Sequence, residues 1–224
     1  MDSNLEKSYF SPIYYLVPTF TLLYVAYRWF QGQSQTTKFT EVRTKPASIV
    51  SVIGSGGHTR EMLRLMGALS GNYSPRHYIL ANTDSISESK VHAMEDDLRK
   101  KKNFKTEYLI HKIPRCREVN QSWFTTVAYT IYSIFYCIPL MVICRPEIIL
   151  CNGPGTCIPV CLVGWIIKCF GIVQTKIIYV ESICRVDKLS MTARLVYKFA
   201  DNIIVQWPEL QSKYPKCEYY GRLV

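Results

Sequence analysis

The sequence predicts an α/β fold in which a parallel sheet is flanked by helices and one transmembrane helix precedes the domain. Three observations support this prediction: apolar β-type segments alternate with helical segments, glycine-rich turns follow two of the strands, and a long apolar segment lies near the N-terminus. At 224 residues and 48% hydrophobic content, the chain has room for one domain of roughly 170–180 residues and an extension.

The extension begins with residues 1–8, which we expect on the lumenal side of a membrane. Residues 9–30 are apolar and aromatic, and at ~1.5 Å per residue they can cross a ~30 Å hydrocarbon core. Basic residues outnumber acidic ones in the polar linker at 31–45, so the positive-inside rule places residues 46–224 in the cytosol. A cleaved signal peptide is the alternative, but the leading residues form no basic region.

Strands and helices then alternate along the domain, which is typical of a doubly wound parallel sheet. Strands are predicted at residues 48–53, 77–81, 106–110, 147–151, 176–180 and 202–205. Helices are predicted at residues 60–69, 88–101, 123–143, 157–169 and 191–199. In such a sheet, ligands bind at the carboxyl ends of the strands.

The uncharged segment 123–144 is long enough to be a second transmembrane span. A second crossing would put the two glycine-rich turns on opposite sides of the membrane, which one open sheet does not permit. We therefore interpret 123–144 as an apolar crossover helix, buried on one side and dipped into the membrane surface on the other, with a true span as the alternative.

Charge and cysteine content narrow the partners and the compartment. Lys and Arg outnumber Asp and Glu by 27 to 17, which favours an anionic partner such as phospholipid or a diphosphate. Nucleic acid is not expected, because the chain has no zinc-finger spacing and no RNP-like motif. The nine cysteines include no CxxC pair, so we expect buried thiols in a reducing compartment, not a disulfide framework or a zinc site.

The most informative segment is the turn after the first strand, Gly54-Ser-Gly-Gly-His-Thr59. Its glycines let a ligand approach the backbone, and the following helix start suits a phosphate or diphosphate. A neutral His58 beside that position can accept a proton from a sugar hydroxyl. The alternative is a tight strand-to-helix turn with His58 as a polar cap. The spacing matches neither GxGxxG nor GxxxxGK[ST], so nicotinamide and P-loop nucleotide sites are not indicated.

Two further features follow predicted strands and should reach the same edge of the sheet. Asn152-Gly-Pro-Gly-Thr156 follows the fourth strand, and Glu181-Ser-Ile-Cys-Arg185 follows the fifth. Each has a structural alternative: Thr156 as a helix cap, and Glu181 as the surface partner of Arg185. For Thr59 and Glu61 we favour a helix-capping role.

Five motifs occur in order: GSGGHT at 54–59, LCNGPGT at 150–156, YVES at 179–182, VQW at 205–207 and YYGRLV at 219–224. With them, the chain resembles the membrane-anchor subunits of the endoplasmic reticulum (ER) N-acetylglucosaminyltransferase that adds the second GlcNAc to dolichyl-diphosphate-GlcNAc. More distantly, it resembles the N-terminal half of the bacterial lipid-linked GlcNAc transferase of peptidoglycan synthesis, a GT-B enzyme with two Rossmann-like domains.

This resemblance implies one Rossmann-like domain of GT-B type on the cytosolic face of the ER membrane, with the nuclear envelope as a second location. It also implies that this chain holds the lipid-linked acceptor, while a soluble subunit supplies the UDP-GlcNAc site. The length of the chain leaves no room for a second Rossmann-like domain. The family is also described as assembling with the GlcNAc-1-phosphate transferase that makes the acceptor. Neither a metal nor a cofactor is expected.

By the same resemblance, His58 is the expected catalytic base, and Glu181 is either the base or the residue that orients His58. The expected acceptor and diphosphate contacts are Gly54, Ser55, Gly56, Gly57, Thr59, Asn152, Gly153, Gly155 and Thr156. The tail, residues 214–224, is expected to bind the soluble subunit or to form a final strand with a frayed end. Its expected contacts are Tyr219, Tyr220, Leu223 and Val224.

Two rival interpretations remain. In the first, the chain is a scaffold for a catalytic subunit and has no part in the chemistry. In the second, it is a lipid- or nucleotide-binding membrane protein without transfer activity. A scaffold should tolerate substitution of the predicted site residues, and a working half-site should not.

Overall fold

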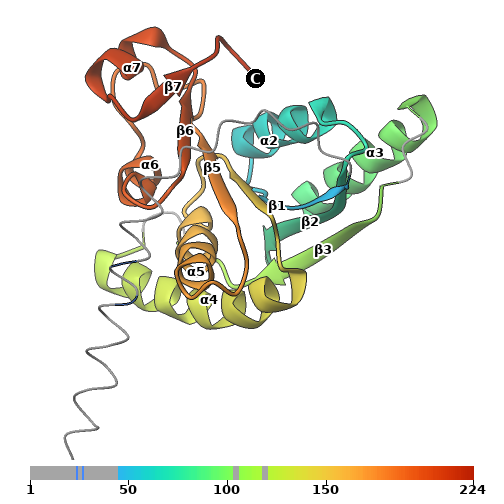
Figure 1. The fold of residues 1–224 in the computed structure, drawn as a ribbon, viewed down its shortest axis with the longest axis horizontal. Helices are drawn as coiled ribbons and strands as arrows, with labels where there is room; N and C mark the ends of the chain where they lie inside the picture. The colour runs from blue at the N-terminus through green and yellow to red at the C-terminus, as the bar shows by residue number, and fades with distance from the viewer. Residues whose placement is uncertain (1–23, 25–26, 28–44, 103–105, 118–120) are drawn as a thin grey trace, which may run out of the picture. The chain divides into compact units, whose positions relative to one another are not determined.

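The computed structural model describes residues 24, 27, 45–102, 106–117 and 121–224 (Figure 1). The predicted transmembrane helix and linker lie outside the described residues, apart from Tyr24 and Tyr27, which are helical, and Lys45. The chain divides into two compact units, residues 1–40 and 41–224. The second unit carries all the elements described below.

The second unit is built on a seven-stranded sheet in the order β3-β2-β1-β4-β5-β6-β7. Every neighbouring pair is parallel, with register such as Ile49 opposite Ile148 between β1 and β4. The strands are β1 (Ala47–Val52), β2 (Tyr73–Ala81), β3 (Tyr108–Ile113), β4 (Ile148–Cys151), β5 (Lys176–Val180), β6 (Asn202–Val205) and β7 (Cys217–Tyr219). The predicted α/β class and doubly wound parallel sheet are therefore confirmed.

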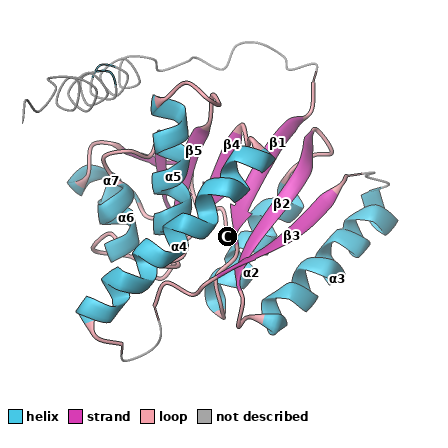
Figure 2. Ribbon diagram, turned by 90° about the horizontal axis from the view of Figure 1, so that it is seen from below, coloured by secondary structure: helices cyan, strands magenta, loops and turns pink. Residues whose placement is uncertain are grey.

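Helices cover both faces of the sheet (Figure 2). They are α2 (Gly57–Ala68), α3 (Ser85–Lys102), α4 (Trp123–Cys144), α5 (Cys157–Cys169), α6 (Met191–Val196) and α7 (Pro208–Lys213). Met62 and Met66 of α2 and Val91 of α3 pack in one buried cluster, whereas Cys137 and Met141 of α4 pack in another with residues of α5 and α6. A parallel sheet with apolar side chains on both faces has to be covered by helices on both faces.

Sequence patterns located the elements well but missed parts of three regions. Strand β2 begins at Tyr73 and not at residue 77, because Arg76, which would normally interrupt a buried strand, is itself fully buried. Its guanidinium donates to Glu95 at 3.2 Å, and that pairing compensates the charge. Strand β3 begins at Tyr108, two residues after the predicted start. The short elements α7 and β7 were not predicted as separate elements.

Helix α4 has two distinct faces. Cys137 and Met141 are fully buried against the sheet, and the Ser133 hydroxyl donates to the Pro114 carbonyl at 2.9 Å. On the other side, Phe124, Phe135 and Ile143 are 91%, 66% and 79% exposed. The helix is long and apolar enough to cross a membrane by length and composition, yet it is docked on the sheet along one side. The buried side agrees with the predicted crossover helix, and the membrane contact of the exposed side stays a prediction.

Candidate active site at the carboxyl edge of the sheet

The predicted site residues lie in the loops that follow β1, β4 and β5, at the carboxyl edge of the sheet. Strands β1 and β4 are neighbours, but β1 leads into α2 on one face of the sheet and β4 leads into α5 on the other. The chain therefore diverges between these two strands, which is where open α/β sheets bind ligands.

The turn after β1 leaves the start of α2 open. Gly56 precedes the helix with φ 64° and carries no side chain to cap it. Thr59 does not face outward: it is fully buried, its hydroxyl donates to the Gly54 carbonyl, and it contacts the Ser87 hydroxyl at 2.9 Å. Thr59 therefore fixes the turn from inside, and the backbone N–H groups near Gly56 and Gly57 remain the groups suited to an anion.

His58 projects from the first turn of α2 and is about one-third exposed, at 36% for its side chain. Its Nδ1 lies 3.2 Å from Oδ1 of Asn152, whose Nδ2 donates to the Val180 carbonyl at 3.2 Å. Because that amide orientation presents an acceptor to the ring, Nδ1 carries the proton. The lone pair on Nε2 is then left to accept a proton.

Gly153 provides the space in which the His58 ring lies. It has φ 79°, and a Cβ atom built there would be 2.1 Å from Cε1 of His58. A Cβ on Gly54 would approach the Cβ of His58 and Pro154 Cγ to 2.9 Å each. The two glycine-rich turns are thus packed directly against each other, with His58 between them. Gly155, by contrast, has open space where a side chain would begin.

The remaining predicted contacts of the two turns vary in accessibility. Asn152 is fully buried and bonded to His58, so it positions that ring. Thr156 is also buried, and its side chain does not cap α5, contrary to the capping alternative. Ser55 is exposed, and the Arg115 guanidinium approaches its hydroxyl to 3.5 Å.

Glu61 is a site residue that the sequence analysis assigned to helix capping. Its Oε1 accepts from the Ser182 hydroxyl at 2.8 Å and from the Ile183 amide at 3.3 Å. Its Oε2 is buried, has no hydrogen-bond partner among the described residues, and lies 3.9 Å from Nδ1 of His58. The two residues are three apart on one helix, and that spacing was the signal that could have paired them.

Glu181 is fully buried, so it is not the surface partner of Arg185. Its carboxylate accepts from the amide of Ser182 at 3.0 Å and from that of Ser190 at 2.7 Å. Burial raises the pKa of this carboxyl above its usual value, and the two amides oppose that shift. The side chain organises the loop between β5 and α6 from within.

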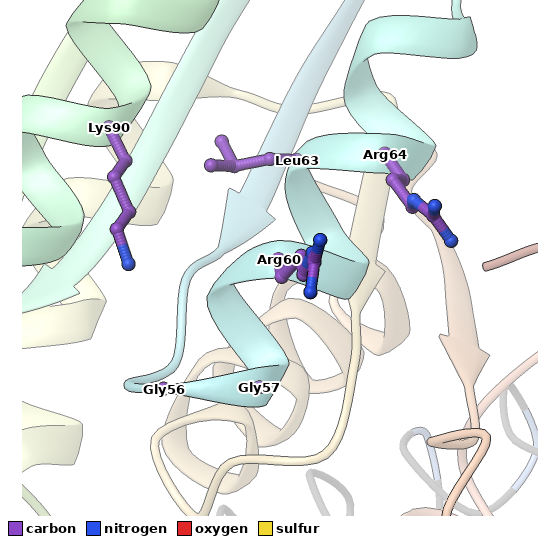
Figure 3. Close-up of a pocket in the computed structure, with 6 residues that line it drawn as sticks. All are labelled: Gly56, Gly57, Arg60, Leu63, Arg64 and Lys90. Atoms are coloured by element: carbon purple, nitrogen blue, oxygen red, sulfur yellow. The ribbon is translucent and has the colours of Figure 1, made fainter.

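A basic pocket of about 670 Å³ adjoins the first turn on the side of α3 (Figure 3). It is lined by Gly56, Gly57, Arg60, Leu63, Arg64 and Lys90. Arg60 and Arg64 are one helical turn apart on α2, and Lys90 comes from α3. The pocket combines backbone N–H groups at a helix start with cationic side chains, which is the chemistry that binds a phosphate or diphosphate. None of these basic residues was predicted as a site residue from the sequence.

The structure describes the tail to its last residue. Tyr219 ends β7, which pairs with β6, so the final strand of the second interpretation is present. The end is held as well: the Leu223 amide donates to Oε1 of Gln206 at 2.8 Å, and Arg222 lies 4.2 Å from the centre of the Trp207 ring. Tyr220 and Leu223 remain 66% and 41% exposed, and Val224 is half-buried.

Comparison with known proteins identifies the family. A family described as "Oligosaccharide biosynthesis protein Alg14 like" matches residues 49–223. The human protein named UDP-N-acetylglucosamine transferase subunit ALG14 is 50% identical over 179 residues, which is 79% of this chain and 83% of the human one. The protein of the same name from Schizosaccharomyces pombe is 42% identical over 172 residues, or 75% of this chain and 79% of its own length.

The fold also has a solved counterpart. The crystal structure of Acinetobacter baumannii MurG matches with a TM-score of 0.50 at 15% identity, over 73% of this chain. The match spans 43% of the MurG chain, so it shows the fold of one part of that protein. From the matched family and its relatives, this chain belongs to the Alg14 family of oligosaccharide biosynthesis proteins.

Proposed function

We propose that this chain is the anchor and acceptor-binding subunit of a heteromeric transferase that moves GlcNAc from UDP-GlcNAc to dolichyl-diphosphate-GlcNAc on the cytosolic face of the ER. The names of the relatives support a UDP-GlcNAc transferase subunit. The observation that carries the proposal is His58, which Asn152 holds with one ring nitrogen free at an open helix start beside a basic pocket.

In the proposed reaction, Nε2 of His58 takes the proton from the 4-hydroxyl of the acceptor GlcNAc. The hydroxyl oxygen forms a bond to the anomeric carbon of the donor sugar as the bond from that carbon to UDP breaks. UDP leaves with the bonding electron pair, and the configuration at the anomeric carbon inverts. The chain supplies the base and its orientation, which lowers the barrier by general base catalysis and positioning.

Glu61 supports this role of His58 electrostatically. When Nε2 accepts a proton, the ring becomes positively charged, and a buried carboxylate oxygen 3.9 Å from Nδ1 stabilises that charge. Glu181 has both oxygens engaged by amides of its own loop. We therefore assign proton transfer to His58 and the shape of the loop to Glu181.

The basic pocket fits the acceptor diphosphate. The amides of Gly56 and Gly57 and the cationic groups of Arg60 and Lys90 are assigned to its oxygens. Donor binding is assigned to a soluble second subunit, because the relatives are named as a subunit of a UDP-N-acetylglucosamine transferase. The GlcNAc-1-phosphate transferase that makes the acceptor is proposed as a further partner, and the nuclear envelope as a second location.

Reconstitution tests the division of labour. Transfer from labelled UDP-GlcNAc to a lipid-diphosphate-GlcNAc acceptor is measured with this chain alone, with the soluble subunit alone and with both together. We expect activity from the pair and none above background from either subunit. Full activity of the soluble subunit alone, with no gain when this chain is added, would refute the half-site.

The exposed face of α4 is proposed to lie in the membrane surface. A photoreactive amino acid at Phe135 should crosslink to lipid acyl chains in membranes, because burying each large apolar side chain contributes about 1.5–3 kcal/mol. Mass spectrometry of the crosslinked peptides provides the measurement. Ile86 of α3 is the control, since it is apolar and 68% exposed, close to the 66% of Phe135, and should not label lipid.

The same experiment separates a surface helix from a spanning one. Met141 is fully buried against the sheet in this fold, so a photoreactive group there should crosslink to protein. Lipid labelling at both positions would mean that α4 leaves the sheet and crosses the bilayer. Absence of lipid labelling at both positions would contradict the proposed contact between α4 and the membrane.

The tail is proposed to bind the soluble subunit. Deleting residues 219–224 removes the exposed Tyr220 and Leu223 and should release that subunit from the membrane fraction to the cytosol. Sedimentation of membranes, followed by quantification of the soluble subunit in pellet and supernatant, measures this release. Tyr220→Ala is the milder variant, because it leaves the bond between Leu223 and Gln206 in place. Unchanged co-sedimentation of the soluble subunit with the truncated chain would contradict the assignment.

A further inference from the structure

A cluster of two histidines and a cysteine lies away from the carboxyl-edge site. His77 comes from β2, His111 from the edge strand β3, and Cys144 from the last turn of α4. Nδ1 of His77 is 3.0 Å from Nε2 of His111, and Sγ of Cys144 lies 3.5 Å and 3.7 Å from these two nitrogens. His77 is buried, and the other two side chains are half-buried.

These distances match those between the ligands of one tetrahedral metal ion. With zinc bonds of about 2.0–2.1 Å to nitrogen and about 2.3 Å to sulfur, two nitrogens lie about 3.3 Å apart and a nitrogen and a sulfur about 3.6 Å apart. The three observed separations all lie within a few tenths of an ångström of these values. The three ligand atoms, which come from three elements, therefore lie close enough together to share one ion.

Hydrogen bonding alone does not account for the triangle equally well. Each ring nitrogen carries either one proton or one lone pair in the ring plane, and the thiol has one weak donor. One N–H···N hydrogen bond between the rings accounts for one of the three distances. The thiol can then form a good hydrogen bond with only one of the two rings. A cation at the centre instead accepts a lone pair from each ring nitrogen and from the Cys144 thiolate, whose proton is released to solvent when the metal binds.

The surrounding backbone favours a cation. Cys144 is the last residue of α4, where the carbonyl end of the helix carries partial negative charge. We propose that His77, His111 and Cys144 bind a zinc ion, with the fourth position open to water from the half-exposed side of the cluster. This site is not expected from the sequence, because its residues are far apart in the chain and have no CxxC spacing.

Such an ion would fasten α4 to the edge of the sheet. Among the described strands, β3 has a neighbour on one side only, and α4 contributes Cys144 from its C-terminal end. One ion bound by residues of β2, β3 and α4 would connect the proposed membrane-surface helix to the two strands at this edge of the sheet. The role is structural, so metal binding and stability are the properties to measure.

The full chain in detergent, stripped of metal and then incubated with Zn²⁺, should retain one zinc ion per chain by elemental mass spectrometry. Co²⁺ in place of Zn²⁺ should give the thiolate-to-cobalt absorption of a tetrahedral site. His111→Ala and Cys144→Ser should weaken zinc binding by at least the roughly 10–100-fold that loss of an outer-sphere partner costs. Zn²⁺ should raise the thermal unfolding temperature of the unchanged chain but not that of these variants.

The other histidines and cysteines of the chain provide controls. His92→Ala and Cys184→Ser alter an exposed histidine and an exposed cysteine outside the cluster, and both should bind zinc as the unchanged chain does. The cobalt spectrum of the unchanged chain decides the question even if a cluster variant does not fold. Absence of the thiolate band, or equal zinc retention by Cys144→Ser and the unchanged chain, would overturn the proposal.

Discussion

A complex carrying His58→Ala should transfer GlcNAc about 10²–10⁴-fold more slowly than the unchanged pair of subunits. The substitution removes the free Nε2 but leaves Asn152 bonded to the Val180 carbonyl and Thr59 bonded to Gly54, so the turn keeps its internal contacts. The loss should therefore appear in kcat and not in folding. The measurement is transfer from labelled UDP-GlcNAc at saturating acceptor, beside thermal unfolding and co-purification of the partner.

A companion variant locates the source of the effect. Glu61→Gln keeps the shape of the side chain near His58 but removes its charge, so it should reduce kcat less than His58→Ala does. The reduction is expected because the protonated ring loses the carboxylate oxygen that lies 3.9 Å from its Nδ1. A normal rate for the folded His58→Ala complex would assign the base to the partner and favour the scaffold interpretation.

Gly153→Ala should reduce activity about 100-fold, which is the size of loss that a misplacement of about 1 Å can cause. The added Cβ would lie 2.1 Å from Cε1 of His58, so the ring has to move away from Asn152. In addition, φ at this position is 79°, a conformation that costs a residue with a side chain about 1–2 kcal/mol. Steady-state transfer kinetics and thermal unfolding measure the two effects separately.

Gly155→Ala is the control for this prediction. It makes the same chemical change two residues away, where no atom of the described residues, apart from the chain neighbours of Gly155, lies within 4 Å of the added Cβ. Because Gly155 is a predicted acceptor contact, this variant should slow transfer far less than Gly153→Ala does, and it should leave the unfolding temperature nearly unchanged. Equal losses for the two variants would show that the turn tolerates no added bulk anywhere, and the specific clash with His58 would lose its support.

The sequence predicted the sheet because β1, β4, β5 and β6 are short apolar runs separated by helical stretches, and both faces of the sheet are covered. It failed where tertiary pairing overrides local preference. Arg76 extends β2 because Glu95, nineteen residues away, compensates its charge. The strand β7 is three residues long, which is too short for a periodic pattern to reveal.

The candidate site was predicted in outline from the rule that strand ends share an edge. That rule predicts that the turns at Gly54 and Gly153 approach one another, but not that the His58 ring lies directly on Gly153. The partners of His58 depend on side-chain directions: Asn152 comes from a loop 94 residues away, and Glu61 faces inward from α2. No local spacing encodes the first of these contacts, and the sequence analysis attributed the second residue to capping.

The direction of α4 bears on how a lipid-linked substrate reaches the protein. Strand β3 ends at the carboxyl edge and β4 starts at the opposite edge, so α4 begins on the side of the His58 site, where Phe124 is 91% exposed. If this face rests on the bilayer as proposed, the site opens close to the headgroups. An acceptor with its polyprenyl chain still in the membrane then searches for the enzyme by lateral diffusion in two dimensions, and its insoluble chain never has to enter water.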